Sequence, residues 1–216
     1  MRGLSVVVVG TGTDVGKTHV SCALLHALGT RARAWKPIES GVTVESSDSA
    51  RLARAGAVVP ALHSFEEPIS PHLAARRSGI TLDRARIVEL ARQHRDASEI
   101  FLIETAGGLL SPLDVHFVNA DLVRELEPDR VLLVAPDRLG VLHDVAATIG
   151  AARTKGVSFD AIVLSAPAVP DASTGSNRSE LSEVFGLGIA ALFPRADFDA
   201  TESQLAARET LLAIRC

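Results

Sequence analysis

Residues 5–18 read SVVVVGTGTDVGKT, and this stretch decides how the rest of the chain can fold. Its four consecutive valines, bounded by Gly10, predict a short strand that is buried on both faces. An apolar run with helical spacing, residues 20–28, follows and predicts a helix. Strand, glycine-rich loop, Gly-Lys-Thr and helix form the pattern of a phosphate-binding loop, because backbone N–H groups and the positive end of the helix converge on an anion.

The residue types in this loop suit a nucleotide. Lys17 would place a compact positive charge on the terminal phosphates, and the hydroxyl of Thr18 could bind a magnesium ion. Gly16 lets the backbone approach the ligand. The loop is a variant of the strict G-x-x-x-x-G-K-[ST] pattern, since Thr11 stands where the first glycine is expected. A glycine-rich turn without a ligand is the alternative, and the strand before it and the helix after it argue against that alternative.

Composition narrows the class of protein. The 216 residues, 47% of them hydrophobic, suit one domain that spans residues 1–216. The net charge of −4 and the lack of a basic run argue against nucleic acid as the main partner. No apolar run approaches the ~20 residues that cross a bilayer, and no signal segment precedes the first strand, so we expect a cytoplasmic protein without a membrane partner. Cys22 and Cys216 form no disulfide framework.

Lysine is rare in this chain. Lys17, Lys36 and Lys155 are its three lysines, against 19 arginines. A position that keeps lysine in such a chain can require a compact ammonium group. Lys17 lies in the loop described above, and Lys36 lies in the next motif.

The motif Lys-Pro-Ile-Glu-Ser-Gly, residues 36–41, follows a predicted strand over residues 31–35. The proline forces extended backbone on Lys36, so Lys36 and Ser40 lie at the carboxyl end of that strand. In an open α/β sheet this is the ligand-binding edge, which also carries the phosphate-binding loop. An exposed lysine at a strand end is the alternative. Asp48 then begins a helical pattern after residues 46–47, and its simplest interpretation is a helix cap or a first-turn acid.

A second acidic motif follows the strand predicted for residues 99–103. Glu104 comes directly after this apolar run and is followed by Thr105, Ala106, Gly107 and Gly108. An acid in this place can hold magnesium, directly or through water, opposite a phosphate-binding loop. A solvated acid at a strand end is the alternative interpretation.

Strands and helices alternate along the whole sequence. Further helices are predicted over residues 80–95, 119–127, 141–155, 177–185 and 201–214, and further strands over residues 130–135, 159–165 and 189–193. This alternation predicts right-handed βαβ units. The expected fold is therefore α/β, with a doubly wound, mostly parallel sheet and helices on both faces.

Four motifs in this order carry a resemblance to a known family. They are residues 10–18 (GTGTDVGKT), 36–41 (KPIESG), 68–72 (PISPH) and 104–108 (ETAGG), followed by Leu139-Gly140. Together they resemble the dethiobiotin synthases, over nearly the whole chain. The resemblance implies a homodimeric P-loop enzyme that closes the ureido ring of dethiobiotin from 7,8-diaminononanoate, CO2 and a nucleoside triphosphate with Mg2+.

The resemblance also implies roles for individual residues. Lys36, Lys17 and Thr11 match catalytic positions, with Lys36 holding the carbamate and the γ-phosphate together. The magnesium positions match Thr18, Asp48 and Glu104. The substrate positions match Ser40, Thr11, Leu139, Gly140 and His143, the last three near the dimer interface. Nucleotide contacts are implied for Thr13, Asp14, Val15, Gly16, Lys17, Thr18, His19, Asp48, Glu104, Thr105, Ala106, Gly107, Ser165, Pro194, Arg195 and Ala196.

Several positions depart from the family pattern. Ser165 stands where the family usually has an asparagine that reads adenine, so the co-substrate could be ATP or another nucleoside triphosphate such as CTP. Thr105 adds a side chain to a motif that usually has glycine there, and the asparagine expected two or three residues after Leu139-Gly140 is replaced near His143.

Three other functions fit the same fold. A nucleotide-switch ATPase of the partition and division-site type would carry a second lysine at the position of Gly12, and this chain has none there. A scaffold that has lost turnover would not need Lys17, Lys36, Asp48 and Glu104. A related ligase that acts on another amine substrate would keep all of them.

Overall fold

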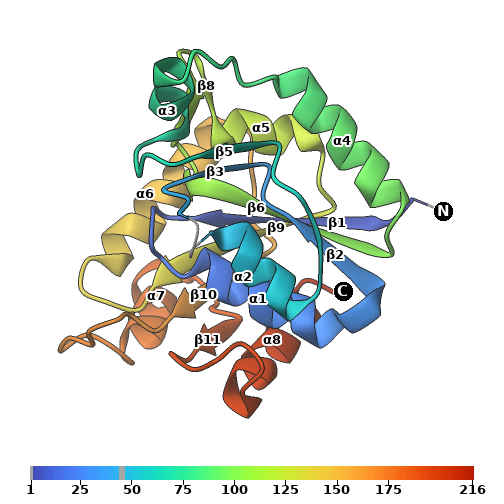
Figure 1. Cartoon of the computed structure of the whole chain (residues 1–216). Helices are drawn as coiled ribbons and strands as arrows, with labels where there is room; N and C mark the ends of the chain where they lie inside the picture. The colour runs from blue at the N-terminus through green and yellow to red at the C-terminus, as the bar shows by residue number, and fades with distance from the viewer. Residues whose placement is uncertain (1, 44–46) are drawn as a thin grey trace.

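A seven-stranded parallel sheet forms the centre of the computed structural model, which describes residues 2–43 and 47–216 (Figure 1). Ser46 of the serine-rich run before Asp48 lies outside the described residues. In sheet order the strands are β11 (Ala191–Phe193), β10 (Ala161–Ser165), β9 (Arg130–Pro136), β1 (Leu4–Gly10), β6 (Ile100–Gly108), β2 (Ala32–Trp35) and β4 (Ala57–Val59).

Strand β1 lies in the middle of the sheet and is hydrogen-bonded on both sides. It pairs with β6, where Val7 faces Ile103, and with β9, where Val8 faces Leu132. The chain first forms β1, β2 and β4, then places β6 between β1 and β2, and finally adds β9, β10 and β11 on the other side of β1, which is the topology of a doubly wound fold. This confirms the predicted architecture, and the carboxyl end of β1 lies at the point where ligands bind in such sheets.

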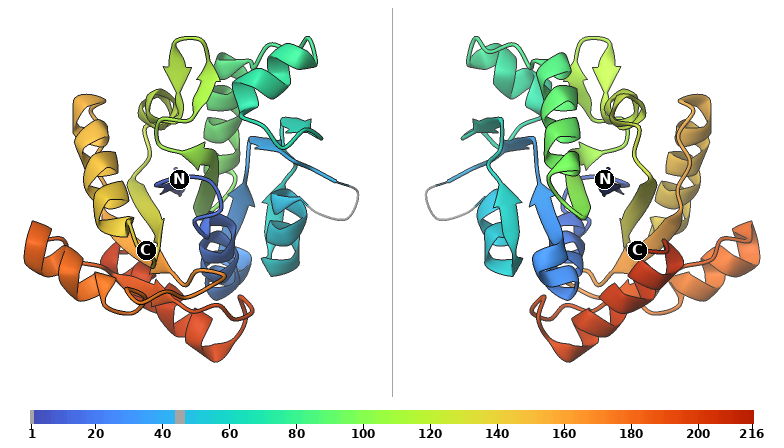
Figure 2. Two further views of the ribbon diagram at one scale, coloured as in Figure 1. Left: turned by 90° about the vertical axis from the view of Figure 1, so that its left-hand side faces the viewer. Right: turned by 90° about the vertical axis from the view of Figure 1, so that its right-hand side faces the viewer.

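Helices cover both faces of the sheet (Figure 2). The alternate valines of β1 divide between the faces: Val6 and Val8 pack in one apolar cluster, and Val7 and Val9 pack in the other. The first face is covered by α1 (Lys17–Leu28), α2 (Asp48–Ala55) and α8 (Thr201–Ala213). The second is covered by α3 (Pro71–Arg77), α4 (Arg84–Asp96), α5 (Asn119–Leu126), α6 (Val141–Thr154) and α7 (Asn177–Phe185).

Smaller elements extend the carboxyl edge of the sheet. β3 (Ile38–Ser40) pairs with β5 (His63–Phe65) in parallel, and β7 (Pro112–Asp114) forms a hairpin with β8 (Phe117–Val118). A short 3-10 helix, η1 (Gly29–Arg31), precedes β2. The sequence pattern did not indicate β3, β4, β5, β7 or β8, because each has only two or three residues and too few positions to show a period.

One strand is longer than its sequence pattern indicates. β6 continues through Gly108, so the motif at residues 104–108 belongs to the strand and not to a loop after it. Pairing of Gly10 with Gly108 extends the contact with β1 beyond the apolar run. Within the described ranges, no helix combines the length and the apolar character that a bilayer crossing needs.

Asn119 fixes the end of β6 from inside the protein. It is fully buried, and its Nδ2 donates to the backbone carbonyls of Ala106 at 2.5 Å and Gly108 at 2.8 Å. These carbonyls lie in the motif that carries Glu104, so Asn119 connects the start of α5 to the candidate site.

We expect Asn119→Ala to lower the free energy of unfolding by about 2 kcal/mol, because two buried carbonyl groups lose their donor. Urea unfolding followed by circular dichroism measures this change. The control is Ser179→Ala, at an exposed position of α7, which should change the free energy of unfolding by less than about 0.5 kcal/mol. A loss in Asn119→Ala no larger than in the control would contradict the proposed structural role.

Candidate active site

The phosphate-binding loop connects β1 to α1 at the centre of the carboxyl edge. Gly16 has φ 97°, a left-handed conformation that favours glycine, and it caps the start of α1. Lys17 is the first residue of the helix, and its Nζ donates to the carbonyl of Gly12 at 2.9 Å. The ammonium group therefore bends back over the loop, on the side where an anion would bind.

Four polar side chains from separate elements meet beside this loop. Lys36, at the end of β2, donates to Glu104 Oε1 on β6 at 2.9 Å and forms an ion pair with Asp48 at the start of α2. Thr18 of α1 donates to the same Glu104 oxygen at 2.8 Å. Lys36, Glu104 and Thr18 are buried. Lys36 is therefore no exposed strand-end lysine, and Glu104 is no solvated strand-end acid.

The two lysines of this cluster have opposite pKa shifts. Burial lowers the pKa of Lys17 to about 8. The negative charge of Glu104 opposes this shift, and the positive charge of Lys36 adds to it. Burial alone would also lower the pKa of Lys36, but the carboxylates of Glu104 and Asp48 outweigh it and raise the pKa above its ordinary value. Burial disfavours the charged form of Asp48, and Lys36 reverses this and lowers its pKa. Lys36 thus stays protonated at pH values at which Lys17 can lose its proton.

Glu104 Oε2 and Thr11 Oγ1 are among the buried side-chain atoms that have no hydrogen-bond partner within the described residues. A buried polar atom without a partner is costly unless a ligand supplies one. Carboxylate and hydroxyl oxygens are the ligands that Mg2+ prefers. Glu104 contacts Thr18 directly and Asp48 through their shared partner Lys36. The donor set therefore fits a magnesium ion.

Residues 104–108 lie directly against the phosphate-binding loop. A Cβ on Gly108 would come within 3.0 Å of the Thr11 carbonyl oxygen, and a Cβ on Gly107 would lie 3.7 Å from the Thr13 hydroxyl. The short contact requires glycine at position 108. At Gly107 the requirement comes from its φ of 71° and from Ser111, because a Cβ would clash with the Ser111 hydroxyl. Thr105 is buried, and its hydroxyl donates into the sheet, to the Val8 carbonyl at 3.2 Å.

A second group of predicted residues lies at the ends of β10 and β11. Ser165 packs so closely on Gly16 that a Cβ on this glycine would clash with the serine hydroxyl. His19 lies edge-on to Phe193, with ring centroids 6.2 Å apart, and burial lowers its pKa. Pro194, Arg195 and Ala196 directly follow β11. The structure thus brings Ser165 to the phosphate-binding loop and His19 to the β11 end.

The predicted substrate positions are more dispersed. Gly140, with φ 92°, caps α6, and the side chain of Leu139 is 74% exposed. The backbone N–H of Leu139 donates to Asp171 Oδ2 at 2.8 Å. His143 is exposed on the first turn of α6, and Ser40 ends β3. Within residues 2–43 and 47–216, no hydrogen bond joins these positions to Lys36 or Glu104.

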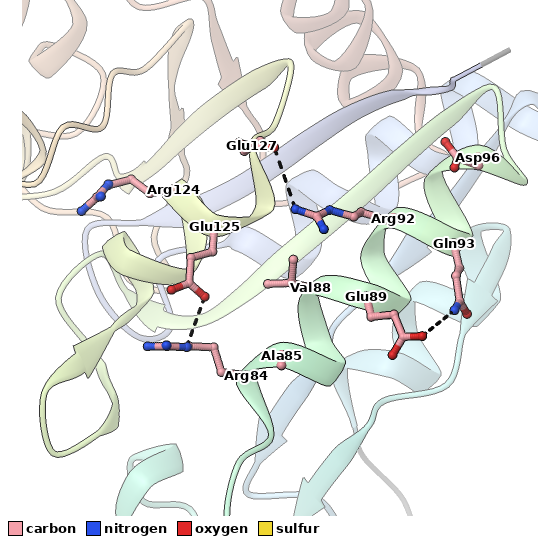
Figure 3. Close-up of a pocket in the computed structure, with 10 residues that line it drawn as sticks. All are labelled: Arg84, Ala85, Val88, Glu89, Arg92, Gln93, Asp96, Arg124, Glu125 and Glu127. Carbon is pink, nitrogen blue, oxygen red and sulfur yellow. Dashed lines mark hydrogen bonds and ion pairs between the residues drawn. The ribbon is translucent and has the colours of Figure 1, made fainter.

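A separate groove of about 700 Å³ lies between α4 and α5 (Figure 3). Its charged residues pair with one another: Arg84 with Glu125 at 3.3 Å, and Arg92 with Glu127 at 4.0 Å. None of its lining residues belongs to the motifs of the carboxyl edge, so this groove is no part of the candidate site.

The structure adds two buried polar residues that sequence reasoning missed near this edge. Asp137 accepts from Asn177 Nδ2 at 2.7 Å and from the Gly175 backbone at 2.9 Å, which joins the loops after β9 and β10. Asp137 directly follows an apolar run, as Glu104 does in the sequence, and this pattern is the signal that could have identified it. The other is Glu39, within the 36–41 motif.

Solved structures with a similar fold include two ATPases. The cell division ATPase MinD of Pyrococcus furiosus superimposes with a TM-score of 0.62 and 16% identity, covering 100% of this chain and 99% of that one. A ParA family ATPase of Chlorobium tepidum gives a TM-score of 0.59 at 15% identity, covering 98% and 92%. At such identities the similarity shows the fold alone.

Sequence relatives are more specific. A family model described as an AAA domain matches residues 5–198. An ATP-dependent dethiobiotin synthetase of Anaeromyxobacter sp. is 42% identical over 173 residues, 76% of each chain. That of Anaeromyxobacter dehalogenans is 38% identical over 204 residues, 90% of each, and that of Saccharopolyspora erythraea is 36% identical over 194 residues, 88% of this chain and 86% of the other. The phosphate-binding loop and the buried cluster beside it are therefore those of a chain that belongs to the ATP-dependent dethiobiotin synthetase family.

Proposed function

We propose that this chain closes the ureido ring of dethiobiotin from 7,8-diaminononanoate, CO2 and ATP, as a ligase of biotin biosynthesis. The observation that carries the proposal is the buried Lys36, which bridges Glu104 and Asp48 beside the phosphate-binding loop. A nucleotide-binding protein without such chemistry has no need to bury a lysine between two acids at the edge of its phosphate site.

The reaction joins three reactants in three steps. One amine of the substrate adds to CO2, loses a proton and becomes a carbamate. A carbamate oxygen attacks the γ-phosphorus, and ADP leaves with the bonding electron pair. The second amine then attacks the carbonyl carbon of this mixed anhydride, phosphate leaves, and a second proton is released as the ring closes.

Charge is the main obstacle to these steps. A carbamate and a triphosphate are both anions, so cations must lie between them for the oxygen to reach the phosphorus. Lys17 would serve the phosphates, and Lys36 would hold the carbamate against the γ-phosphate. The buried hydroxyl of Thr11, which lacks a partner within the described residues, would donate to the carbamate or its amine. Magnesium, when bound by Thr18, Asp48 and Glu104, would neutralise phosphate oxygens.

The remaining substrate contacts are proposed from the family resemblance. Ser40 would contact the amine side. The backbone N–H groups at Leu139 and Gly140, with His143 nearby, would bind the substrate carboxylate across a homodimer interface. In this structure the Leu139 N–H donates to the Asp171 carboxylate, which the substrate carboxylate would have to displace. We infer a single domain and a cytoplasmic location, with neither nucleic acid nor membrane as a partner.

The base of the nucleotide would lie near the ends of β10 and β11. ATP is the co-substrate named for the relatives, and CTP is a second candidate here because Ser165 is shorter than a base-reading asparagine and packs on Gly16. His19, Pro194, Arg195 and Ala196 would surround the base. Thr13, Asp14, Val15, Gly16, Thr105, Ala106 and Gly107 would line the phosphates.

A nucleotide switch and a ligase for another amine are the alternatives. MinD and ParA share the fold of this chain, but Gly12 stands where a nucleotide switch of the partition and division-site type is expected to carry a second lysine. A ligase for another amine would keep the cluster around Lys36 and Glu104 and differ only in the amine substrate that it binds.

Turnover with 7,8-diaminononanoate, bicarbonate and magnesium tests the proposal. ATP, CTP and GTP are supplied in parallel, and dethiobiotin is detected by mass. We expect product with ATP, and the ranking of the three nucleotides measures base selection. Nucleotide hydrolysis without dethiobiotin would refute ring closure and support a switch, whereas product from another diamine alone would support the related ligase.

Lys36→Met should lower kcat roughly 10²–10³-fold, because a charge that stabilises the transition state is lost, while nucleotide affinity changes little. Steady-state kinetics and calorimetric binding of a non-hydrolysable ATP analogue give the two quantities. Lys155→Met is the control, since Lys155 pairs with Asp121 at 3.2 Å, away from the phosphate-binding loop. Equal losses of affinity and turnover would make Lys36 a phosphate ligand only.

Nucleotide binding should take up a proton above about pH 8. In the free protein Lys17 has a pKa of about 8, so it is mostly neutral at higher pH, and the triphosphate raises this pKa by favouring the charged form. Calorimetry in buffers of different ionisation enthalpy should show uptake that grows between about pH 7 and pH 9. An unchanged proton count across this range would contradict the assignment of Lys17.

A further inference from the structure

Glu39 has no task in the function proposed above, although it lies within the same motif as Lys36. It is the middle residue of β3 and is only 4% exposed. None of the ion pairs formed by the described residues involves it. Burying a carboxyl group is costly unless hydrogen bonds compensate, so its partners indicate what it does.

The two partners of Glu39 lie on different elements. Oε2 accepts from the backbone N–H of Ser49 at 3.1 Å, and Oε1 accepts from the hydroxyl of Ser64 at 3.1 Å. Ser64 belongs to β5, the strand paired with β3. Ser49 is the second residue of α2 and directly follows Asp48. Glu39 therefore connects the sheet edge to the amide next to a proposed magnesium ligand.

Helix α2 is held in two different ways along its length. Leu52 is fully buried and packs with Leu24 and Leu25 of α1. In the first turn none of the residues 48–50 is buried, and the Asp48 side chain is 33% exposed. Polar groups hold this turn: the Ser47 hydroxyl accepts from Ala50 N at 2.9 Å, and Glu39 accepts from Ser49. An acid at the positive end of a helix is electrostatically favourable.

We propose that Glu39 is a positioning residue, which holds the first turn of α2 so that the Asp48 carboxylate stays against Lys36 and the phosphate-binding loop. Glu39 acts through the Ser49 amide and touches no reacting atom. The proposal rests on the proposed function in one respect, which is that Asp48 serves the magnesium ion.

The test is the gain in nucleotide affinity that magnesium provides. Binding of a non-hydrolysable ATP analogue to the full chain is measured by calorimetry with and without Mg2+, and the ratio of the two affinities is compared among variants. Because both affinities come from the same variant, a reduced folded fraction cancels in the ratio. We expect Glu39→Ala to lower this ratio about tenfold, as is typical for loss of a group that orients a metal ligand.

Two matched variants distinguish the loss of the hydrogen bond between Glu39 and Ser49 from the loss of the negative charge of Glu39. Glu39→Gln keeps an oxygen that can accept from Ser49, so its ratio should stay within about twofold of the parent protein. Ser64→Ala removes the other hydrogen bond of Glu39 and leaves the contact with Ser49, so it should also stay near the parent. A ratio as low in Glu39→Gln or Ser64→Ala as in Glu39→Ala, or an unchanged ratio in Glu39→Ala while Asp48→Ala lowers it, would overturn the proposal.

The variant Asp48→Ala shows whether a negative result contradicts the role of Glu39 or the magnesium role of Asp48 in the proposed function. If Asp48→Ala leaves the ratio unchanged, the magnesium role of Asp48 fails, and hydrogen exchange of residues 47–51 then decides on Glu39 alone. Glu39→Ala should speed exchange there, and Glu39→Gln should restore the protection, because the Ser49 amide loses and regains its acceptor. Equal exchange in the parent and Glu39→Ala would overturn the positioning role.

Discussion

The buried ion pairs of Lys36 with Glu104 and Asp48 are the interaction on which the candidate site depends. Removing charged groups from water is costly, and close geometry with further hydrogen bonds must compensate. Here Glu104 also accepts from Thr18, so three charges and one hydroxyl form a single connected cluster. Loss of one member would leave another charge buried without its partner. This constraint ties the ends of β2 and β6 to the starts of α1 and α2.

The parallel sheet explains why these groups can meet. Parallel strands all end at the same edge, and β1 lies between β6 and β9 at the point where the chain changes direction across the sheet. Glycine at position 108 lets β6 approach the phosphate-binding loop closely, which a larger residue would hinder. Glu104, on the same strand, accepts a hydrogen bond from Thr18 in the first turn of α1.

In this protein the fold alone does not determine the function. MinD and ParA ATPases share its architecture at about 15% identity, and the dethiobiotin synthetases share 36–42% of its aligned residues. A doubly wound sheet with a phosphate-binding loop hosts several activities, so the activity follows from side chains at the carboxyl edge. In the proposed function the second lysine of this edge is Lys36, which directly follows β2, and the loop itself has glycine at position 12.

The sequence by itself determined the phosphate-binding loop, the alternation of strands and helices and the motifs around Lys36 and Glu104, because these are local patterns with a fixed period or spacing. The local pattern alone indicated a first-turn acid at Asp48, and only the family resemblance implied a magnesium position there; Glu39 was passed over. Only the tertiary structure decided that Lys36 bridges Asp48 and Glu104, that β6 extends to Gly108 and that Glu39 accepts a hydrogen bond from Ser49 of α2. The physical reason is distance along the chain. Lys36 and Glu104 are 68 residues apart, and no local pattern encodes a contact that forms only when two strands pair in register.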